Sequence, residues 1–105
     1  MFGDIFGNLE EQQKAVNEKL ATLRIEAEAG NGAVRVTADG NQKILNISIN
    51  REGLDWDDQE QVEDLVLEAV NRALDASKEK SEEEAQNLVK NILPPGMEGL
   101  KGMLG

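Results

Sequence analysis

The 105-residue chain contains no cysteine and no histidine. Without cysteine it can form neither disulfides nor zinc–thiolate sites, and without histidine it lacks the commonest general base and transition-metal ligand. Its acidic side chains occupy solvent positions between apolar ones, and the segment "DWDDQE" resembles a helix cap more than an oxygen cage for a cation. We therefore expect no enzymatic activity, no catalytic residues, no cofactor and no metal site.

Membrane and secretion signals are also missing from the sequence. The longest apolar runs, such as "ILNISI", are far shorter than the roughly 20 residues that cross a bilayer. No basic segment followed by an apolar one opens the chain as a signal peptide would. The sequence predicts a cytoplasmic protein that contacts no membrane.

Positive charge is scarce, because 21 Asp and Glu stand against 11 Lys and Arg, for a net charge of −10. The excess is uneven: residues 51–80 sum to −6 (four basic, ten acidic), whereas residues 1–24 and 25–50 each sum to −1. A net negative charge opposes loose, charge-driven binding to nucleic acid. Because most of the negative charge lies in one segment, it opposes nucleic-acid binding at particular surfaces and not over the whole protein.

Aromatic residues are limited to Phe2, Phe6 and Trp56, so the core must be built from Leu, Ile, Val and Ala. The length fits one domain over residues 1–105, with a flexible Gly-rich tail from about residue 94. A chain of this size buries a small share of its surface. Oligomerisation is therefore expected before any motif is considered.

The spacing of apolar residues changes along the chain. Over residues 4–27 they recur at alternating intervals of three and four, which predicts a helix with a narrow packing seam. From residue 25 to 50 the period is two, in "IEAEA", "AVRVTAD" and "ILNISIN", and the turn sequences "GNG" and "DGN" separate these runs. The pattern predicts a three-stranded antiparallel meander with one apolar face. Residues 24–27 fit either the helix or the first strand.

A second and longer helix follows. Asp57 and Glu60 fit a capping box at its start, and its apolar pattern continues to Ile92, ahead of Pro94–Pro95. Some 35 residues at about 1.5 Å each would reach about 50 Å, more than the sheet can cover. The polar stretch 78–84 is expected to be solvated or to project beyond the body. We predict an α+β fold that consists of a helix, a three-stranded antiparallel sheet and a long helix. A self-complementary homodimer would bury the apolar faces that this protomer leaves uncovered.

Several motifs occur together, in a characteristic order. They are the pattern G-x-G-x-V-x-V from Gly30, the helical segment "EDLVLEAVNRAL" with Ala69, Asn71 and Ala73, and "LPPGM" from residue 93 to 97. In these features, over nearly its whole length, the chain resembles the YbaB/EbfC family of bacterial nucleoid-associated proteins. These are small DNA-binding homodimers.

The resemblance implies a helix–three-strand–helix protomer that dimerises through the sheet region, with helical arms projecting like tweezers. It further implies a non-enzymatic protein of the cytoplasm and nucleoid that grips double-stranded DNA between these arms through backbone contacts and DNA shape. A role in nucleoid organisation and gene regulation would follow. Genes of the family often neighbour that of a recombination mediator, which points by association to a protein partner in recombination or repair.

The basic residues form no dense cluster that would mark a nucleic-acid footprint. The near-neutral first helix and the arm of the long helix are the candidate contact surfaces, and their lysines are the candidate DNA contacts: Lys14, Lys19, Lys78 and Lys80. Acidic neighbours one helical turn away predict the surface pairs Lys14–Glu10, Arg72–Glu68, Lys78–Glu82 and Lys80–Glu84.

The alternative to a DNA-binding function, supported by the net charge, is an acidic dimeric module that engages a protein partner and has little or no DNA affinity.

Overall fold

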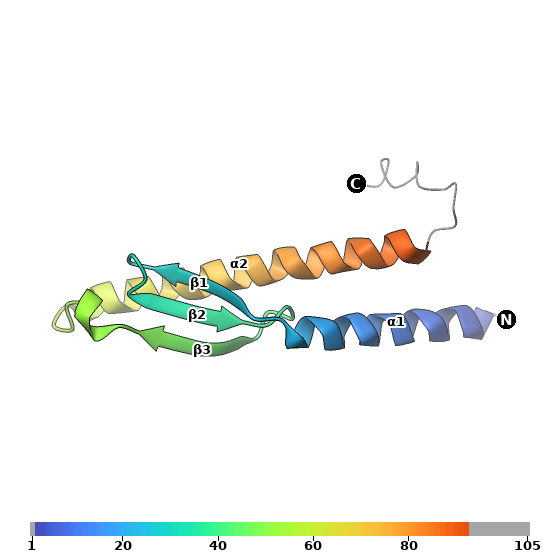
Figure 1. Cartoon of the computed structure of the whole chain (residues 1–105), viewed down its shortest axis with the longest axis horizontal. Coiled ribbons are helices and arrows are strands. Elements are labelled where there is room, and N and C mark those ends of the chain that lie inside the picture. The colour runs from blue at the N-terminus through green and yellow to red at the C-terminus, as the bar shows by residue number, and fades with distance from the viewer. Residues whose placement is uncertain (1, 93–105) are drawn as a thin grey trace.

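The computed structural model describes residues 2–92, and within that range the side chains of residues 9–90. The elements, shown in Figure 1, follow in the order α1 (Phe2–Thr22), β1 (Ile25–Ala29), β2 (Val34–Ala38), β3 (Ile44–Ile49), the short 3-10 helix η1 (Arg51–Gly53) and α2 (Gln59–Ile92). The predicted α+β fold of helix, three strands and long helix is confirmed.

The first helix is shorter than the apolar spacing predicts. It ends at Thr22, whose hydroxyl donates to the Lys19 carbonyl oxygen at 2.6 Å, and Ile25 already pairs with Ala38 in the sheet. Of the ambiguous residues 24–27, Arg24 lies between the two elements and residues 25–27 belong to β1, because alternation in "IEAEA" and pairing with β2 outweigh continuation of the helix. The helix predicted to extend to residue 27 ends earlier, at Thr22, so that part of the prediction is wrong.

The sheet has the order β1-β2-β3 with both neighbouring pairs antiparallel, as the meander pattern predicts. Val36 in the central strand lies opposite Ala27 on one side and Ile47 on the other, so these three apolar residues share one face of the sheet. The "GNG" turn places Gly30, Asn31 and Gly32 at positive φ. Glycine and asparagine tolerate this region better than other residues do, which explains the short connection.

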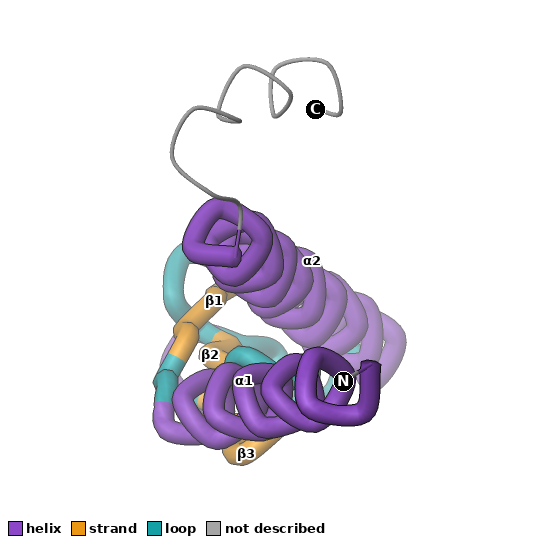
Figure 2. The backbone as a smooth tube through the Cα atoms, turned by 90° about the vertical axis from the view of Figure 1, so that its right-hand side faces the viewer, coloured by secondary structure: helices purple, strands orange, loops and turns teal. Residues whose placement is uncertain are grey.

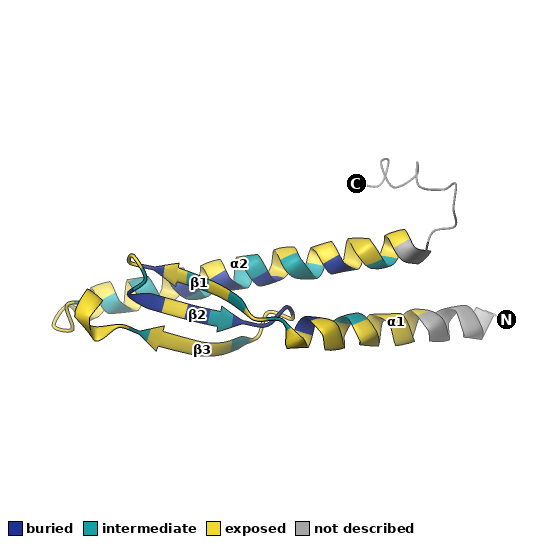
Figure 3. Ribbon diagram, viewed as in Figure 1, coloured by how far each residue is buried: buried dark blue, intermediate teal, exposed yellow. Residues whose placement is uncertain are grey.

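The core lies between that sheet face and α2. Val34 and Val36 of β2 pack against Ala69 and Ala73 of α2, and all four are fully buried. The small alanines allow the helix backbone to approach the sheet closely. Because α2 packs against β1 and β2 and barely reaches β3, Ile47 on the third strand stays 44% exposed. Figure 3 shows most of β3 in the colour of exposed residues.

The start of α2 is displaced by one residue from the predicted capping box. Asp58, not Asp57, is the cap, since its carboxylate accepts a hydrogen bond from the Gln61 backbone N–H at 3.1 Å. Asp57 is instead held in the preceding turn, where its N–H donates to the Asp55 carboxylate at 3.0 Å. The run of α2 to Ile92 is confirmed. The predicted stop at the two prolines and the predicted tail lie outside the described residues.

Both helices extend beyond the same end of the sheet. Figure 1 shows α1 running toward the sheet and α2 running away from it, and Figure 2 shows the two helices lying one above the other beyond the strands. We call α1 and the part of α2 from residue 77 to 92 the arms. The polar stretch 78–84 projects beyond the sheet as predicted, but it is not wholly solvated, because Glu84 is buried.

Candidate nucleic-acid interface

The turn between β2 and β3, residues 39–43, holds the base of the α1 arm. The Gly40 N–H donates to the Leu20 carbonyl oxygen at 2.8 Å, and the Asn41 side-chain amide donates to the Asn17 carbonyl oxygen at 2.9 Å. Carbonyl groups at the C-terminal end of a helix have no partner within the helix. The turn therefore caps α1 and fixes the place where it leaves the body.

The same turn holds α2 through Ser77. The Ser77 side chain is fully buried, and its hydroxyl donates to the Asp39 carbonyl oxygen at 2.6 Å and accepts from the Gln42 N–H at 2.8 Å. The Asp39 carboxylate in turn accepts from the N–H groups of Asn41 and Lys43, which shapes the turn. We call this turn, with the C-terminal end of α1 and the part of α2 around Ser77 that are bound to it, the hub.

Gly40 is required at the hub by close packing. A Cβ atom at this position would lie 2.7 Å from Leu20 Cδ2 and 2.9 Å from the Leu20 carbonyl oxygen. Both distances are below van der Waals contact. The sequence "DGN" predicts a turn here, but only the structure shows that this turn lies directly against α1.

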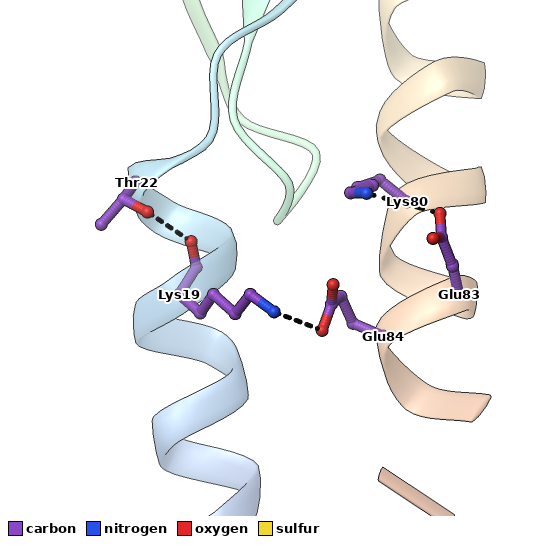
Figure 4. Close-up of polar contacts among 5 residues, drawn as sticks. All are labelled: Lys19, Thr22, Lys80, Glu83 and Glu84. Carbon is purple, nitrogen blue, oxygen red and sulfur yellow. Dashed lines mark hydrogen bonds and ion pairs between the residues drawn. The ribbon is translucent and has the colours of Figure 1, made fainter. Parts of the chain in front are cut away.

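Beyond the hub, an ion pair joins the two arms. Lys19 Nζ of α1 lies 3.1 Å from Glu84 Oε2 of α2, and Figure 4 shows the two side chains reaching toward one another across the space between the helices. The residue Glu84 is only 8% exposed, whereas the Lys19 side chain is 61% exposed. Sequence reasoning missed this pair because its members are separated by 65 positions.

The predicted surface pairs are confirmed only in part. Arg72 pairs with Glu68 as expected. The predicted Lys80–Glu84 pair is wrong, since Lys80 Nζ lies 3.5 Å from Glu83 Oε2 and Glu84 faces α1 (Figure 4). Within residues 9–90, no ion pair joins the other two predicted couples, Lys14–Glu10 and Lys78–Glu82.

The structure does not bring the four candidate lysines together. Lys19 lies on the side of α1 that faces α2, and Lys80 lies one turn before Glu84 on the corresponding side of α2. At 3.6 residues per turn, Lys14 is about 140° around α1 from Lys19, and Lys78 is about 120° around α2 from Glu84. Lys14 and Lys78 are exposed and point away from the space between the arms.

The space between the arms of one chain is small. A cleft of about 220 Å³ is lined by Ala15, Val16, Lys19, Glu84, Asn87 and Leu88, a mixture of apolar, amide and oppositely charged groups. The ion pair crosses this cleft, so near the hub the space between α1 and α2 of a single chain is too small for a DNA duplex. A duplex would have to contact the outer faces of the arms or lie between arms of two chains.

Negative charge is concentrated at the opposite end of the molecule from the arms. Residues 51–66 contain one basic and seven acidic residues, a net charge of −6, and Figure 1 shows η1 and the start of α2 at the far end from the α1 N-terminus. The Arg51 guanidinium lies 5.3 Å from the centroid of the Trp56 ring there. Most of the charge that opposes DNA binding is thus remote from the arms.

The described residues contain no group of three or more acidic side chains arranged to hold a metal ion. In the same part of the chain, none of the helices combines the length and the apolar character that a membrane span requires.

Comparison with known proteins gives a consistent result. A protein of Moorella thermoacetica named "Nucleoid-associated protein" is 41% identical over 85 residues, which cover 81% of this chain and 82% of that one. A protein of the same name from Chlorobaculum parvum is 39% identical over 97 residues, covering 90% and 86%. The crystal structure of the uncharacterized protein HP0035 from Helicobacter pylori shares the fold, with a TM-score of 0.75 at 20% identity over 84% of this chain and 92% of that one. The family model of the YbaB/EbfC DNA-binding family matches residues 2–92, and the chain belongs to this family.

Proposed function

We propose that the protein is a non-enzymatic, homodimeric DNA-binding protein of the cytoplasm and nucleoid, which organises the nucleoid and regulates genes. The observation that carries the proposal is the pair of joined arms that project beyond the sheet, in a chain that belongs to a DNA-binding family. The name shared by the relatives, nucleoid-associated protein, supports the location.

Dimerisation follows from the uncovered apolar surface of the body. Ile47 and Leu45 on β3 are 44% and 39% exposed. Exposed apolar groups of this kind mark interaction surfaces, and a self-complementary contact between two copies is the commonest way to cover them. A two-fold dimer would present two pairs of arms to one duplex.

DNA contact is assigned to the outer faces of the arms. Lys14 and Lys78 point outward and form no ion pair within residues 9–90, so their ammonium groups are available to phosphates. Lys80, bound to Glu83 at 3.5 Å and partly exposed, adds positive charge nearby. Two such contacts per chain in a dimer would give a slope of about −3.6 for log K against log salt, which means binding that is modest and salt-sensitive.

The proposal is tested by titrating a labelled duplex with the full chain at two salt concentrations. We expect binding that weakens as salt rises, and further weakening in the double variant Lys14→Gln/Lys78→Gln. The matched control is Arg35→Gln/Arg51→Gln, which removes the same charge from the body, away from the arms. Equal affinities of the two double variants would contradict the assignment of these lysines.

The outcome that would overturn the function itself is the absence of binding by the unmodified chain at physiological salt and micromolar protein. That result would favour the alternative of an acidic dimeric interaction module, whose partner would be a protein, for instance one of recombination or repair. The net charge of −10 supports this alternative.

A further inference from the structure

Glu84 is a buried carboxylate in a segment whose sequence, "KEKSEEEAQ", is almost entirely polar. Removing a carboxylate from water is unfavourable unless the group is paired and hydrogen-bonded. Lys19 Nζ at 3.1 Å is the partner that the described residues supply to it. The burial of Glu84 therefore depends on α1 lying where it does.

Apolar side chains lie beside this pair. Ala15 and Val16 of α1 and Leu88 of α2 line the cleft next to the two charged groups, and Glu84 is buried there while the Lys19 side chain remains 61% exposed. Every member of the other ion pairs in residues 9–90 is more exposed than Glu84, and none of those pairs links α1 to α2. Exposed pairs contribute little to stability, whereas a buried carboxylate that loses its partner is left uncompensated, which is unfavourable.

The position of the pair along the arms gives it a mechanical consequence. The hub holds α2 at Ser77, and Glu84 lies two helical turns farther along, about 10 Å from it. On α1, the hub holds the carbonyls of Asn17 and Leu20, and the pair holds Lys19, which lies between them in sequence. The hub bonds join α1 to the turn, whereas the pair joins α1 directly to α2 beyond Ser77 and so adds a second point that fixes the direction of one helix relative to the other.

We propose that Lys19 and Glu84 form a latch that keeps α1 and α2 together as one rigid arm, and that Lys19 is a positioning residue for DNA binding. The second part of this proposal rests on the proposed function. Lys19 would act through Glu84, not through a phosphate, and would present Lys14 on the outer face of α1 in a fixed orientation.

The test measures the distance between the arms directly. Because the chain has no cysteine, cysteines introduced at the exposed positions Gln12 and Gln86 accept spin labels without background. Labelled protein is diluted into an excess of unlabelled protein so that only distances within one chain contribute. The distance distribution is recorded for the otherwise unmodified chain, for Lys19→Glu, for the charge exchange Lys19→Glu/Glu84→Lys, and for Lys14→Glu as the control on the outer face of α1.

The latch predicts a narrow distribution in the unmodified chain and loss of that narrow distribution in Lys19→Glu, where two negative charges meet. The charge exchange restores it, and Lys14→Glu leaves it unchanged. Restoration also shows that Lys19→Glu fails through the lost pair and not through misfolding. An unchanged distribution in Lys19→Glu, or no restoration by the exchange, would overturn the latch.

DNA binding by the same variants separates this proposal from the proposed function. A positioning role for Lys19 predicts that Lys19→Glu loses DNA affinity and that the charge exchange recovers it. The variants that lose affinity should be the same ones that lose the narrow distance distribution. Loss of affinity with unchanged distances would make Lys19 a phosphate contact instead. If no variant binds DNA while the distances respond as predicted, the proposed function fails and the latch remains.

Discussion

Ser77 of α2 is bound to Asp39 of the β2–β3 turn through a buried hydroxyl that donates to the Asp39 carbonyl oxygen at 2.6 Å. The same hydroxyl accepts a hydrogen bond from the Gln42 N–H. Gly40, which follows Asp39 in the turn, donates its N–H to the carbonyl oxygen of Leu20 in α1. A single turn thus connects two helices that are separated by the whole sheet in sequence. Whatever the arms bind, their origin is set by this turn.

Replacing Ser77 with alanine leaves the Asp39 carbonyl and the Gln42 N–H buried without a partner. We expect Ser77→Ala to lower the free energy of unfolding by about 1–3 kcal/mol, even though alanine has the higher helix propensity. Urea unfolding at one fixed protein concentration measures the change, since the stability of an oligomer depends on concentration.

The matched control is Ser81→Ala, one turn farther along the same helix. Ser81 is partly exposed, and its hydroxyl makes no hydrogen bond within residues 9–90. This variant should be neutral or slightly stabilising. Equal destabilisation by the two substitutions would show that the hub bonds of Ser77 do not determine stability.

Gly40→Ala should displace the end of α1 from the turn, because the new Cβ would lie 2.7 to 2.9 Å from atoms of Leu20, including its carbonyl oxygen. Overpacking of this kind costs about 1–3 kcal/mol in the free energy of unfolding. Gly53→Ala is the graded comparison, since its nearest neighbour would be Ala33 Cβ at 3.1 Å. Thermal unfolding should rank Gly40→Ala below Gly53→Ala in stability, and the reverse order would contradict the packing argument.

The sequence predicts what is local and misses what depends on three-dimensional approach. Alternation over residues 25–50 predicts the meander correctly because a period of two is a property of each strand alone. The helix cap is misplaced by one residue because Asp55, Asp57 and Asp58 are all chemically able to cap.

The arms also combine local features that the sequence predicts with contacts that it does not. The apolar spacing of α1 predicts a packing seam, yet of its described members only Leu20, beside the hub, is fully buried, and Leu9 is exposed. The spacing of residues within α2 predicts Lys80 as the partner of Glu84, but it cannot predict a contact between Glu84 and α1. The true partner, Lys19, depends on how the hub aims both helices.

Ile47→Glu should convert the proposed dimer into a monomer, because it places a charge on the apolar sheet face that α2 leaves uncovered. Sedimentation equilibrium over a range of protein concentrations measures the mass. Ser48→Glu is the control: it adds the same charge to the adjacent residue, which points to the opposite face of β3, opposite Arg35. Retention of the dimer mass by Ile47→Glu would place the dimer contact elsewhere.

The salt dependence of DNA binding should distinguish a phosphate contact from a positioning residue. Lys14→Gln removes a proposed phosphate contact from each chain of a dimer, so the slope of log K against log salt should become shallower by about 2. Lys19→Met loosens the arm but leaves the bound complex with its phosphate contacts, so it should weaken binding with nearly the same slope. Fluorescence anisotropy of one labelled duplex at four or more salt concentrations, about 50 to 200 mM, gives both slopes. An equal loss of slope in the two variants would show that Lys19 contacts phosphate directly, as Lys14 is proposed to do.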